Sequence, residues 1–273
     1  MNPADEALFN AKVVGREDLT PELCVIRVAP EKGEAPDFLP GQYATLGLPP
    51  AEDDTEQQAK KGLGRFWLRP YSIASPPSER RFLEFYVALV EDGAFTPKMW
   101  ALQEGDGLWM GPKCKGTFTM EHLPRDQHIV TISTGTGLAP FMSMLNHYRG
   151  QDRWKTYTVI HGTRKCNDLG YRRELEAVVG DDPTVRYIPT CSREPDEPGN
   201  DWKGLRGRVN VAIETKNFRQ FAGIDLDPAD CQVFLCGNPQ MIEDIEHDLH
   251  QRGFTTYQKK NNPDGNIHHE KYW

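Results

Sequence analysis

The sequence lacks several features that would place it in a specialised class of protein. No stretch of its 273 residues approaches the ~18 consecutive apolar residues that a membrane-spanning helix needs. The segment from Met1 to Glu6 has neither the basic nor the apolar region of a secretory signal. Basic residues are not in excess, since 32 Lys and Arg stand against 40 Asp and Glu. We therefore expect a cytoplasmic protein that binds neither membrane nor nucleic acid.

The cysteines lack the spacing of a metal site. No two of them form a Cys-x-x-Cys pair, which argues against a zinc ribbon and the usual iron–sulfur motifs, so no metal is expected. Scattered cysteines in a chain without a secretory signal are typical of free thiols in a reducing compartment. The six are Cys24, Cys114, Cys166, Cys191, Cys231 and Cys236.

The composition that is present is that of an ordinary globular protein. Hydrophobic residues make up 38% and charged residues 26%, and the 24 glycines and 21 prolines are near average usage. This is enough apolar mass for a sizeable core. The length fits one large domain or two moderate ones.

Residues 1–123 have the pattern of a small antiparallel β-barrel. Short β-rich runs alternate with turn residues such as Pro40-Gly41, as in barrels of short strands. The polar segment 51–64 is expected to be a solvated loop. Thr96 and Pro97 are typical of the N-cap and first position of a helix, which we expect over 96–102. The expected strands are 11–19, 23–29, 43–48, 70–74, 82–89 and 107–111.

Residues 124–273 have a different pattern, in which strands alternate with helices. Such alternation is typical of βαβ units around a parallel sheet. The sequence therefore predicts two domains, a β-barrel and then an α/β domain. The expected strands of the second are 129–133, 156–162, 185–191 and 232–236, and its expected helices are 141–148, 169–179 and 239–251.

A glycine-rich segment, Gly135-Thr136-Gly137-Leu138-Ala139-Pro140, joins a predicted strand to a predicted helix. Backbone N–H groups at such a junction, with glycines that allow a close approach, are typical of a pyrophosphate site. Pro140 replaces the third glycine of the dinucleotide fingerprint, and the lysine of a phosphate-binding Walker motif is absent. A tight strand–helix turn without a ligand stays open as the alternative.

Arginines follow the later strands of the α/β domain. Arg164 and Arg193 come after two successive strands, and Arg206 and Arg208 lie just beyond. Ligands of open α/β sheets bind at the carboxyl ends of the strands, and an arginine there suits the 2′-phosphate of NADP. A single arginine is by default a solvated surface charge, but several after strand ends favour NADP over NAD.

A third motif, Arg69-Pro70-Tyr71-Ser72-Ile73-Ala74-Ser75, lies on a predicted strand of the barrel. Residues two apart share a face, so Arg69 and Tyr71 point one way and Ser72 the other. A cation beside an aromatic ring suits a phosphate next to a flat ring, and a plain barrel strand is equally compatible.

Taken in order, these motifs resemble the ferredoxin–NADP(+) reductase family, most closely its bacterial ferredoxin/flavodoxin reductases. The resemblance covers essentially the whole chain. It implies an FAD-binding antiparallel β-barrel domain followed by an NADP-binding α/β domain with a parallel sheet. The matching segments are Arg69-x-Tyr71-Ser72-x-x-Ser75, Pro40-Gly41-Gln42, Gly135-Thr136-Gly137-x-Ala139-Pro140, Cys236-Gly237-Asn238-Pro239-x-Met241 and Tyr272-Trp273.

The resemblance implies the residues that contact FAD. Arg69 would contact the pyrophosphate, Tyr71 would pack beside the flavin ring, and Ser72 would lie near flavin N5. Thr96 would place the start of its helix at the FAD phosphates, and Thr136 would lie where flavin and nicotinamide meet. The full set is Arg69, Pro70, Tyr71, Ser72, Phe85, Tyr86, Val87, Thr96, Gly116, Thr117, Thr136, Tyr272 and Trp273.

The resemblance also implies the NADP site. Arg193 and Arg208 would bind the 2′-phosphate, and Cys236 would lie beside the nicotinamide, with Ser72 and Cys236 as the catalytic positioning groups. A cysteine that serves only as a small core residue is the alternative for Cys236. The implied set is Gly135, Gly137, Arg164, Ser192, Arg193, Arg208, Cys236, Gly237, Asn238 and Pro239.

The tail of the chain leaves two questions open. The resemblance implies that the terminal aromatic Trp273 stacks on the FAD adenine, whereas terminal residues often fray. His268-His269-Glu270-Lys271 stands where some relatives have a small residue against the flavin. An imidazole that tunes the flavin or gates nicotinamide access, and a solvated polar tail, are both compatible with the sequence.

The implied activity is that of a ferredoxin– or flavodoxin–NADP(+) reductase, an FAD-dependent oxidoreductase that moves electrons between NADPH, as hydride, and a one-electron carrier. Between residues 60 and 81 six basic residues stand against one acidic residue, and such a patch steers an acidic partner whatever the net charge. A flavin reductase component and an FAD-binding electron-relay subunit of a larger complex stay open. The expected docking residues for ferredoxin or flavodoxin are Lys60, Lys61, Arg65, Lys113 and Lys115.

Overall fold

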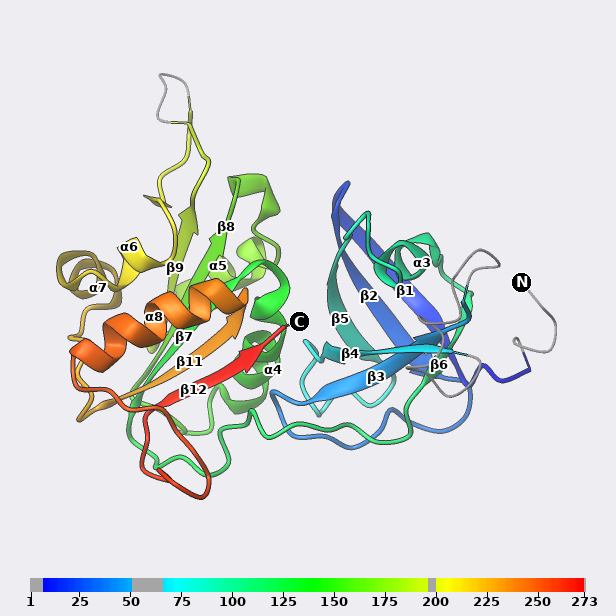
Figure 1. Cartoon of the computed structure of the whole chain (residues 1–273), viewed down its shortest axis with the longest axis horizontal. Coiled ribbons are helices and arrows are strands. Elements are labelled where there is room, and N and C mark those ends of the chain that lie inside the picture. Colours follow the sequence, from blue (N-terminus) through cyan, green and yellow to red (C-terminus); the bar gives the residue numbers. More distant parts are fainter. Residues whose placement is uncertain (1–6, 51–65, 196–199, 273) are drawn as a thin grey trace. The chain divides into compact units, whose positions relative to one another are not determined.

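The structure is a computed structural model that describes residues 7–50, 66–195 and 200–272. Their contacts divide the chain into two compact units, which Figure 1 draws in the colours of the sequence. The barrel unit comprises Met1–Met120 and Met142–His147, and the sheet unit comprises Glu121–Phe141 and Tyr148–Trp273. The domain boundary after residue 123 stays a prediction. The expected loop 51–64, the expected docking residues Lys60, Lys61 and Arg65, and Trp273 lie outside the described residues.

The barrel unit is built on an antiparallel sheet of six strands in the order β4-β3-β6-β1-β2-β5. A bridge between Ile73 and Phe85, and a hydrogen bond from Ala74 N to Glu84 O (2.8 Å), link the β4 end of the sheet to β5. This closure removes strand edges that would otherwise expose unpaired backbone groups. The strands are β1 (Ala11–Thr20), β2 (Leu23–Pro30), β3 (Tyr43–Leu48), β4 (Trp67–Ser72), β5 (Leu83–Ala88) and β6 (Gly107–Met110).

Alternate side chains of these strands fill the barrel. Leu83, Phe85 and Val87 of β5 belong to its core, together with Ile26 and Val28 of β2. Successive side chains of a strand point to opposite faces, so each strand contributes every second residue. Burying one large apolar side chain contributes about 1.5–3 kcal/mol, so this core is a main source of the unit's stability.

The predicted antiparallel barrel is confirmed, and each expected strand is present, although the one expected at 70–74 is β4 (Trp67–Ser72), which begins and ends earlier. The helix is present as α3 (Thr96–Ala101), but Thr96 is not its N-cap as the sequence predicted. Phe95 holds that position, and no side chain caps the helix. The Thr96 hydroxyl group instead donates to Val90 O (2.9 Å) and accepts from Val90 N (3.0 Å). The hydroxyl group is therefore used to hold the preceding loop and not to cap the helix.

The sheet unit contains six strands in the order β10-β9-β8-β7-β11-β12, and all neighbouring pairs are parallel. Parallel neighbours need crossover connections, and helices lie between β7 and β8, between β8 and β9, and between β11 and β12. The strands are β7 (His128–Thr134), β8 (Thr156–Thr163), β9 (Val185–Cys191), β10 (Leu205–Arg206), β11 (Cys231–Gly237) and β12 (Ile267–Lys271). The helices that follow these strands are α4 (Ala139–Tyr148), whose residues Met142–His147 belong to the barrel unit, α5 (Arg172–Asp181), α6 (Asn210–Ile213), α7 (Thr215–Ala222) and α8 (Pro239–Gln251).

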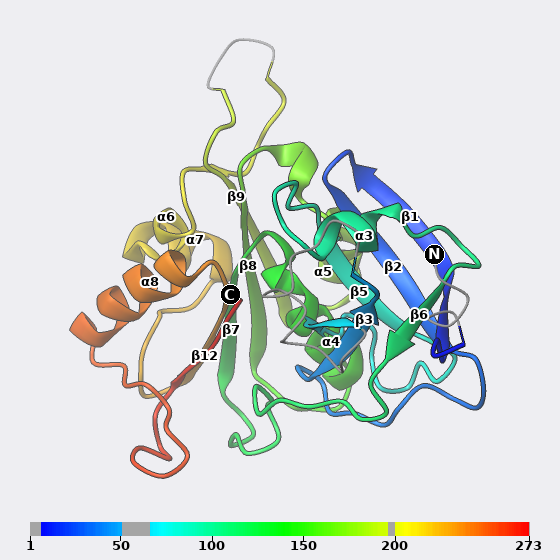
Figure 2. The same cartoon turned by 45° about the vertical axis from the view of Figure 1, so that its right-hand side comes forward.

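Helices cover both faces of this sheet. Figure 2 shows α6, α7 and α8 on one side and α5 on the other. Val130 of β7 and Leu235 of β11 share one core with Ile242 and Ile245 of α8. A sheet covered on both faces needs apolar residues at nearly every position of its central strands. The run Val233–Cys236, which is buried throughout, illustrates this pattern.

The α/β prediction is confirmed for the second unit. Helix α5 begins at Arg172, later than expected, because a 3₁₀ turn, η2 (Cys166–Asp168), and a left-handed Tyr171 (φ 58°) precede it. None of the helices within residues 7–50, 66–195 and 200–272 is long and apolar enough to cross a membrane. The sequence did not predict β10, α6, α7 and β12.

Strand β12 is held by an aromatic stack within the sheet unit. The ring of His268 stacks on Phe234 with centroids 4.5 Å apart, and Tyr257 and His122 pack against it at 4.8 and 5.2 Å. Its Nε2 group donates to Gln232 Oε1 at 3.1 Å. His268 is 5% exposed, so the solvated polar tail is wrong for this residue.

Burial of His268 has a consequence for the acid stability of the protein. Desolvation, with smaller contributions from His122 and His269, lowers its pKa from 6.5 to about 3. Between these two values the unfolded chain binds more protons than the folded chain, so stability falls as the pH falls from about 6.5. One such group contributes up to about 1.4 kcal/mol per pH unit to the free energy of unfolding.

The slope of the free energy of unfolding against pH gives the number of protons that the chain takes up when it unfolds. We expect the substitution His268→Phe, which keeps a ring in the stack, to reduce this number by about one. The measurement is urea unfolding of both proteins at several values between about pH 6.5 and pH 4. His247→Phe, at an exposed position of α8, is the control and should retain the wild-type slope. Identical slopes for His268→Phe and wild type would contradict the buried neutral imidazole.

Candidate functional site

Strand β4 of the barrel unit brings a cation together with aromatic rings. The Arg69 guanidinium lies 6.0 Å from the centre of the Phe95 ring and 5.9 Å from that of Trp67. Tyr71 also packs on Phe95, with centroids 6.0 Å apart. Arg69 is exposed, whereas Ser72 is only 7% exposed. Arg69 and Tyr71 therefore share a cluster with Phe95, a residue that the sequence motif does not contain.

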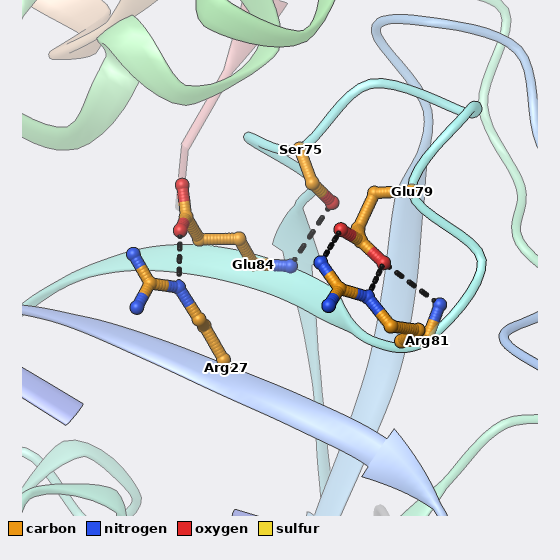
Figure 3. A network of polar contacts seen from close by, with 5 residues as sticks. All are labelled: Arg27, Ser75, Glu79, Arg81 and Glu84. Carbon is orange, nitrogen blue, oxygen red and sulfur yellow. Dashed lines mark hydrogen bonds and ion pairs between the residues drawn. The ribbon is translucent and has the colours of Figure 1, made fainter. Parts of the chain in front are cut away.

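The end of this motif is fixed by polar contacts, which Figure 3 shows. Ser75 Oγ accepts from Glu84 N (3.1 Å), and Arg27 Nε donates to the Glu84 carboxylate (2.8 Å). Nearby, hydrogen bonds from the Arg81 side chain, and one from its backbone, lower the pKa of Glu79 to about 2. Because Arg27 and Arg81 each pair with a carboxylate, this network holds the chain in place rather than presenting a net positive charge.

The residues of β5 that the resemblance assigns to the flavin lie on different faces. Phe85 and Val87 are fully buried in the core of the barrel, at 0% and 1% exposure. Tyr86 lies between them on the strand and therefore faces the other way. A ligand on the face of Tyr86 would meet Phe85 and Val87 only through their backbone.

The Pro40-Gly41-Gln42 motif positions a second loop of the barrel unit. Gly41 has φ +94°, and a Cβ there would lie 1.9 Å from Phe118 O, so only glycine fits. Gln42 Nε2 donates to Gly116 O at 3.0 Å. The motif therefore holds the segment that contains Gly116 and Thr117, two residues implied for FAD.

The glycine-rich segment of the sheet unit forms a 3₁₀ turn, η1 (Gly135–Leu138), between β7 and α4. Gly135 has φ +53° and open space where its Cβ would be. At Gly137 a Cβ would lie 2.3 Å from Cys236 O, so this glycine is required where the turn meets β11. The close approach that the sequence attributed to a ligand is made at Gly137 by the protein's own backbone.

The Cys236-Gly237-Asn238-Pro239 motif ends β11 and begins α8. Asn238 Oδ1 accepts from Gln240 N (2.9 Å) and Met241 N (3.3 Å), and Pro239 occupies the first turn, as in a well-capped helix. Cys236 is 0% exposed, and burial raises its pKa well above the usual value. Its thiol is therefore protonated at neutral pH.

Tyr272 continues from β12 along the end of β11. Its N–H group donates to Gly237 O (3.3 Å), and its side chain forms a hydrogen bond with the Cys236 thiol. These contacts anchor the chain at Tyr272, so the end is not frayed at this residue.

Backbone hydrogen bonds gather the arginines beyond β8 and β9. Ser192 N donates to Thr163 O (3.0 Å), and Arg193 N donates to Arg164 O (2.8 Å). Strand β10 runs parallel to β9, so Arg208, just beyond β10, comes to the same edge of the sheet. The arginines that the sequence singled out are therefore neighbours at one edge.

Unlike other arginines of the sheet unit, these arginines are not paired with carboxylates among the described residues. Arg164, Arg193 and Arg208 are exposed, and within the described part of the chain their side chains form no ion pair. Arg172, by contrast, binds the Glu176 carboxylate at 2.7 Å. Exposed cations held together without a carboxylate favour binding of an anionic ligand.

The basic patch expected in the barrel is weaker than the sequence indicated. Arg80 pairs with Glu34 (3.0 Å) and with Asp37, and Arg81 pairs with Glu79. Two of the basic residues between positions 60 and 81 are therefore neutralised, partly by carboxylates far away in the sequence. Lys113 and Lys115 are exposed.

In the part of the chain that the structure describes, the cysteines are neutral thiols and no metal cluster is found. All six cysteines are free, and burial raises the pKa of Cys24 to about 12 and that of Cys114 to about 11. Among residues 7–50, 66–195 and 200–272, no group of three or more His, Cys, Asp or Glu side chains is placed to hold a metal ion.

The residues implied for the two cofactors fall into different units. The barrel unit contains Arg69, Pro70, Tyr71, Ser72, Phe85, Tyr86, Val87, Thr96, Gly116 and Thr117. The sheet unit contains Gly135, Thr136, Gly137, Arg164, Ser192, Arg193, Arg208, Cys236, Gly237, Asn238, Pro239 and Tyr272.

Comparison with known proteins begins with the sheet unit, where residues 131–247 match the model of the oxidoreductase NAD-binding domain. The chain is 32% identical over 219 residues to the ferredoxin–NADP reductase of Azotobacter vinelandii, and the aligned region covers 76% of each chain. It is 30% identical over 212 residues to the flavodoxin/ferredoxin–NADP reductase of Escherichia coli K12, with 77% of each chain covered.

The whole fold also matches a solved structure. The crystal structure of a ferredoxin NADP+ reductase from Neisseria gonorrhoeae with bound FAD and NADP has a TM-score of 0.81. The match has 25% sequence identity and covers 97% of this chain and 99% of that one. The fold agrees along 97% of the chain and the sequence along 76–77% of it, and the chain belongs to the ferredoxin–NADP(+) reductase family.

Proposed function

We propose that the protein is an FAD-dependent oxidoreductase that moves electrons between NADPH and a one-electron carrier of the ferredoxin or flavodoxin type. One observation carries the proposal. In a member of this family, Arg164, Arg193 and Arg208 gather at one sheet edge and pair with no carboxylate among the described residues. Such a set suits the additional phosphate that distinguishes NADP from NAD.

The sheet unit suits the rest of the nucleotide as well. The turn η1 leaves open space at Gly135, and the first N–H groups of a helical turn have no partner within it. Gly135 and Thr136 would therefore hold the pyrophosphate side of NADP, and Arg193 and Arg208 its 2′-phosphate. A guanidinium group matches phosphate oxygens in a bidentate manner, which gives direction as well as charge.

The barrel unit suits FAD. The exposed guanidinium of Arg69 would bind the FAD phosphates, while Tyr71 offers a ring against which a flat cofactor can pack. Thr96 supports this region through its bonds to the Val90 backbone rather than as a helix cap. Strand β4 therefore offers a cation for the phosphates of FAD and an aromatic face for its ring.

When bound, FAD supplies the exchange of electrons, two at a time with NADPH and one at a time with the protein carrier. The chain binds and orients the reactants. We assign Ser72 and Cys236 as positioning groups for the rings, Ser72 from β4 and Cys236 from the end of β11. Since the pKa of Cys236 is raised by burial, its thiol stays protonated and acts by shape and dipole, not as a base.

An assay of the purified, FAD-loaded protein with ferricyanide tests the proposal. We expect oxidation of NADPH, with kcat/KM at least about tenfold above that for NADH, because one charge-assisted phosphate contact is worth about 1.5–3 kcal/mol. A relay subunit would oxidise neither nucleotide. A flavin reductase component would reduce free flavin and leave ferredoxin and flavodoxin unreduced.

The arginine cluster makes a sharper prediction. Arg193→Ala and Arg208→Ala should each raise the KM for NADPH by about tenfold to a hundredfold and leave the KM for NADH almost unchanged. Arg219→Ala is the matched control, because Arg219 is an exposed arginine of the same unit that pairs with Asp225. Equal effects on NADPH and NADH would show that these arginines do not read the 2′-phosphate.

Docking of the carrier is proposed to use Lys113 and Lys115 of the barrel unit. Lys113→Glu combined with Lys115→Glu should raise the KM for an acidic ferredoxin or flavodoxin and flatten its dependence on salt, because steering by charge is screened at high ionic strength. The KM for NADPH should not change. Lys32→Glu, an exposed charge reversal in the same unit, is the control. A salt-independent KM for the carrier in the wild type would contradict electrostatic docking.

A further inference from the structure

We infer that His161 is a positioning residue for NADP binding, because its hydrogen bond to Gly135 fixes the direction of the peptide group that presents the Thr136 N–H group to the nucleotide. The inference rests on the proposed function, since it concerns the turn η1. The sequence motifs do not include His161, which lies in β8.

The geometry around His161 defines which ring nitrogen carries the proton. Its Nε2 atom lies 3.1 Å from Gly135 O. A carbonyl oxygen only accepts, so Nε2 donates and Nδ1 carries a lone pair. His161 is 0% exposed, and Nδ1 has no hydrogen-bond partner in the described part of the chain.

This arrangement is not explained by packing alone. A buried polar atom without a partner destabilises a fold by about 1–3 kcal/mol. An apolar side chain of similar size would fill the same volume beside Ser133 of β7 and Pro189 of β9 without that cost. The imidazole is therefore accounted for by the one bond it does make, which goes to the glycine turn.

The charge state of the ring is also fixed by its surroundings. Burial lowers the pKa of His161 to about 4, and the hydrogen bond to Gly135 acts in the opposite sense. No charged side chain from the neighbouring strands or helices contributes to this shift. At neutral pH the ring is therefore neutral and remains a single Nε2–H donor.

The bond determines where the next amide group points. The structure has no cis peptide bonds among the described residues, so the C=O of Gly135 and the N–H of Thr136 point in opposite directions. With the carbonyl group held towards His161 inside the sheet, the Thr136 N–H group is directed away from it. Gly135 has φ +53° and no side chain, so the direction of its peptide group is set by hydrogen bonds alone, those within the turn η1 and the one from His161.

Two ligands distinguish the turn η1 from the arginine edge. NADP+ spans the turn η1 and the arginine edge, whereas 2′-AMP has the 2′-phosphate and adenine but no pyrophosphate. A change at the turn should therefore weaken NADP+ and spare 2′-AMP. A general loosening of the sheet unit would weaken both.

The test is calorimetric titration of the FAD-loaded protein with NADP+ and with 2′-AMP. We expect His161→Leu to raise the Kd for NADP+ by about tenfold, the worth of one hydrogen bond, and to change the Kd for 2′-AMP by less than about twofold. His161→Gln places an amide N–H group near the position of Nε2 and should restore most of the affinity for NADP+. Hydrogen exchange of the Thr136 amide should be faster in His161→Leu than in wild type.

The control is His128→Leu, at the opposite end of β7, where His128 Nδ1 bonds to Thr156 Oγ1 (2.8 Å). It should leave both affinities unchanged. If His161→Leu does not fold, His161→Asn, whose shorter amide does not reach Gly135, takes its place with the same expected result. Unchanged NADP+ binding, or equal weakening of both ligands, overturns the inference. A wild-type protein that binds neither ligand overturns the proposed function instead.

Discussion

The close approach of the turn η1 to the end of β11 is the constraint on which the sheet unit depends. Here two backbones meet with no room for a side chain, since a Cβ on Gly137 would lie 2.3 Å from Cys236 O. The register makes the meeting unavoidable, because Ser133 of β7 is level with Cys236 on one side and with His161 on the other. The glycine turn, the buried thiol and the buried imidazole therefore reach the same edge of the sheet at the same height.

A similar constraint operates in the barrel unit. The left-handed Gly41 lies against Phe118 O, and Gln42 binds Gly116 O, so a short motif fixes a distant loop. In both units, residues of a family motif hold backbone segments together. The groups left facing outward, such as Arg69 on β4, are then available for a cofactor. Binding motifs of this kind contain the scaffold of a site as well as its contacts.

The sequence predicted the strands whose residues alternate or are apolar throughout, because those patterns follow directly from burial on one or two faces. It missed β12, because Ile-His-His-Glu-Lys has no apolar pattern. In β12, His268 is buried because its ring stacks on Phe234 and bonds to Gln232, residues far away in the sequence. It misassigned Thr96 for a related reason, since the partner of the hydroxyl group is a loop residue, Val90.

The arginines show why charge cannot be interpreted from the sequence alone. Arg80 appears in a basic segment, yet Glu34 and Asp37 neutralise it, and such exposed pairs contribute little to stability. Arg164 and Arg193, which the sequence singled out because they follow strand ends, are joined by a hydrogen bond between their backbones, and their side chains form no ion pair within residues 7–50, 66–195 and 200–272. Exposed guanidinium groups without a carboxylate leave this part of the surface positively charged. The position of the carboxylates, not the number of basic residues, therefore decides which part of the surface keeps a net positive charge.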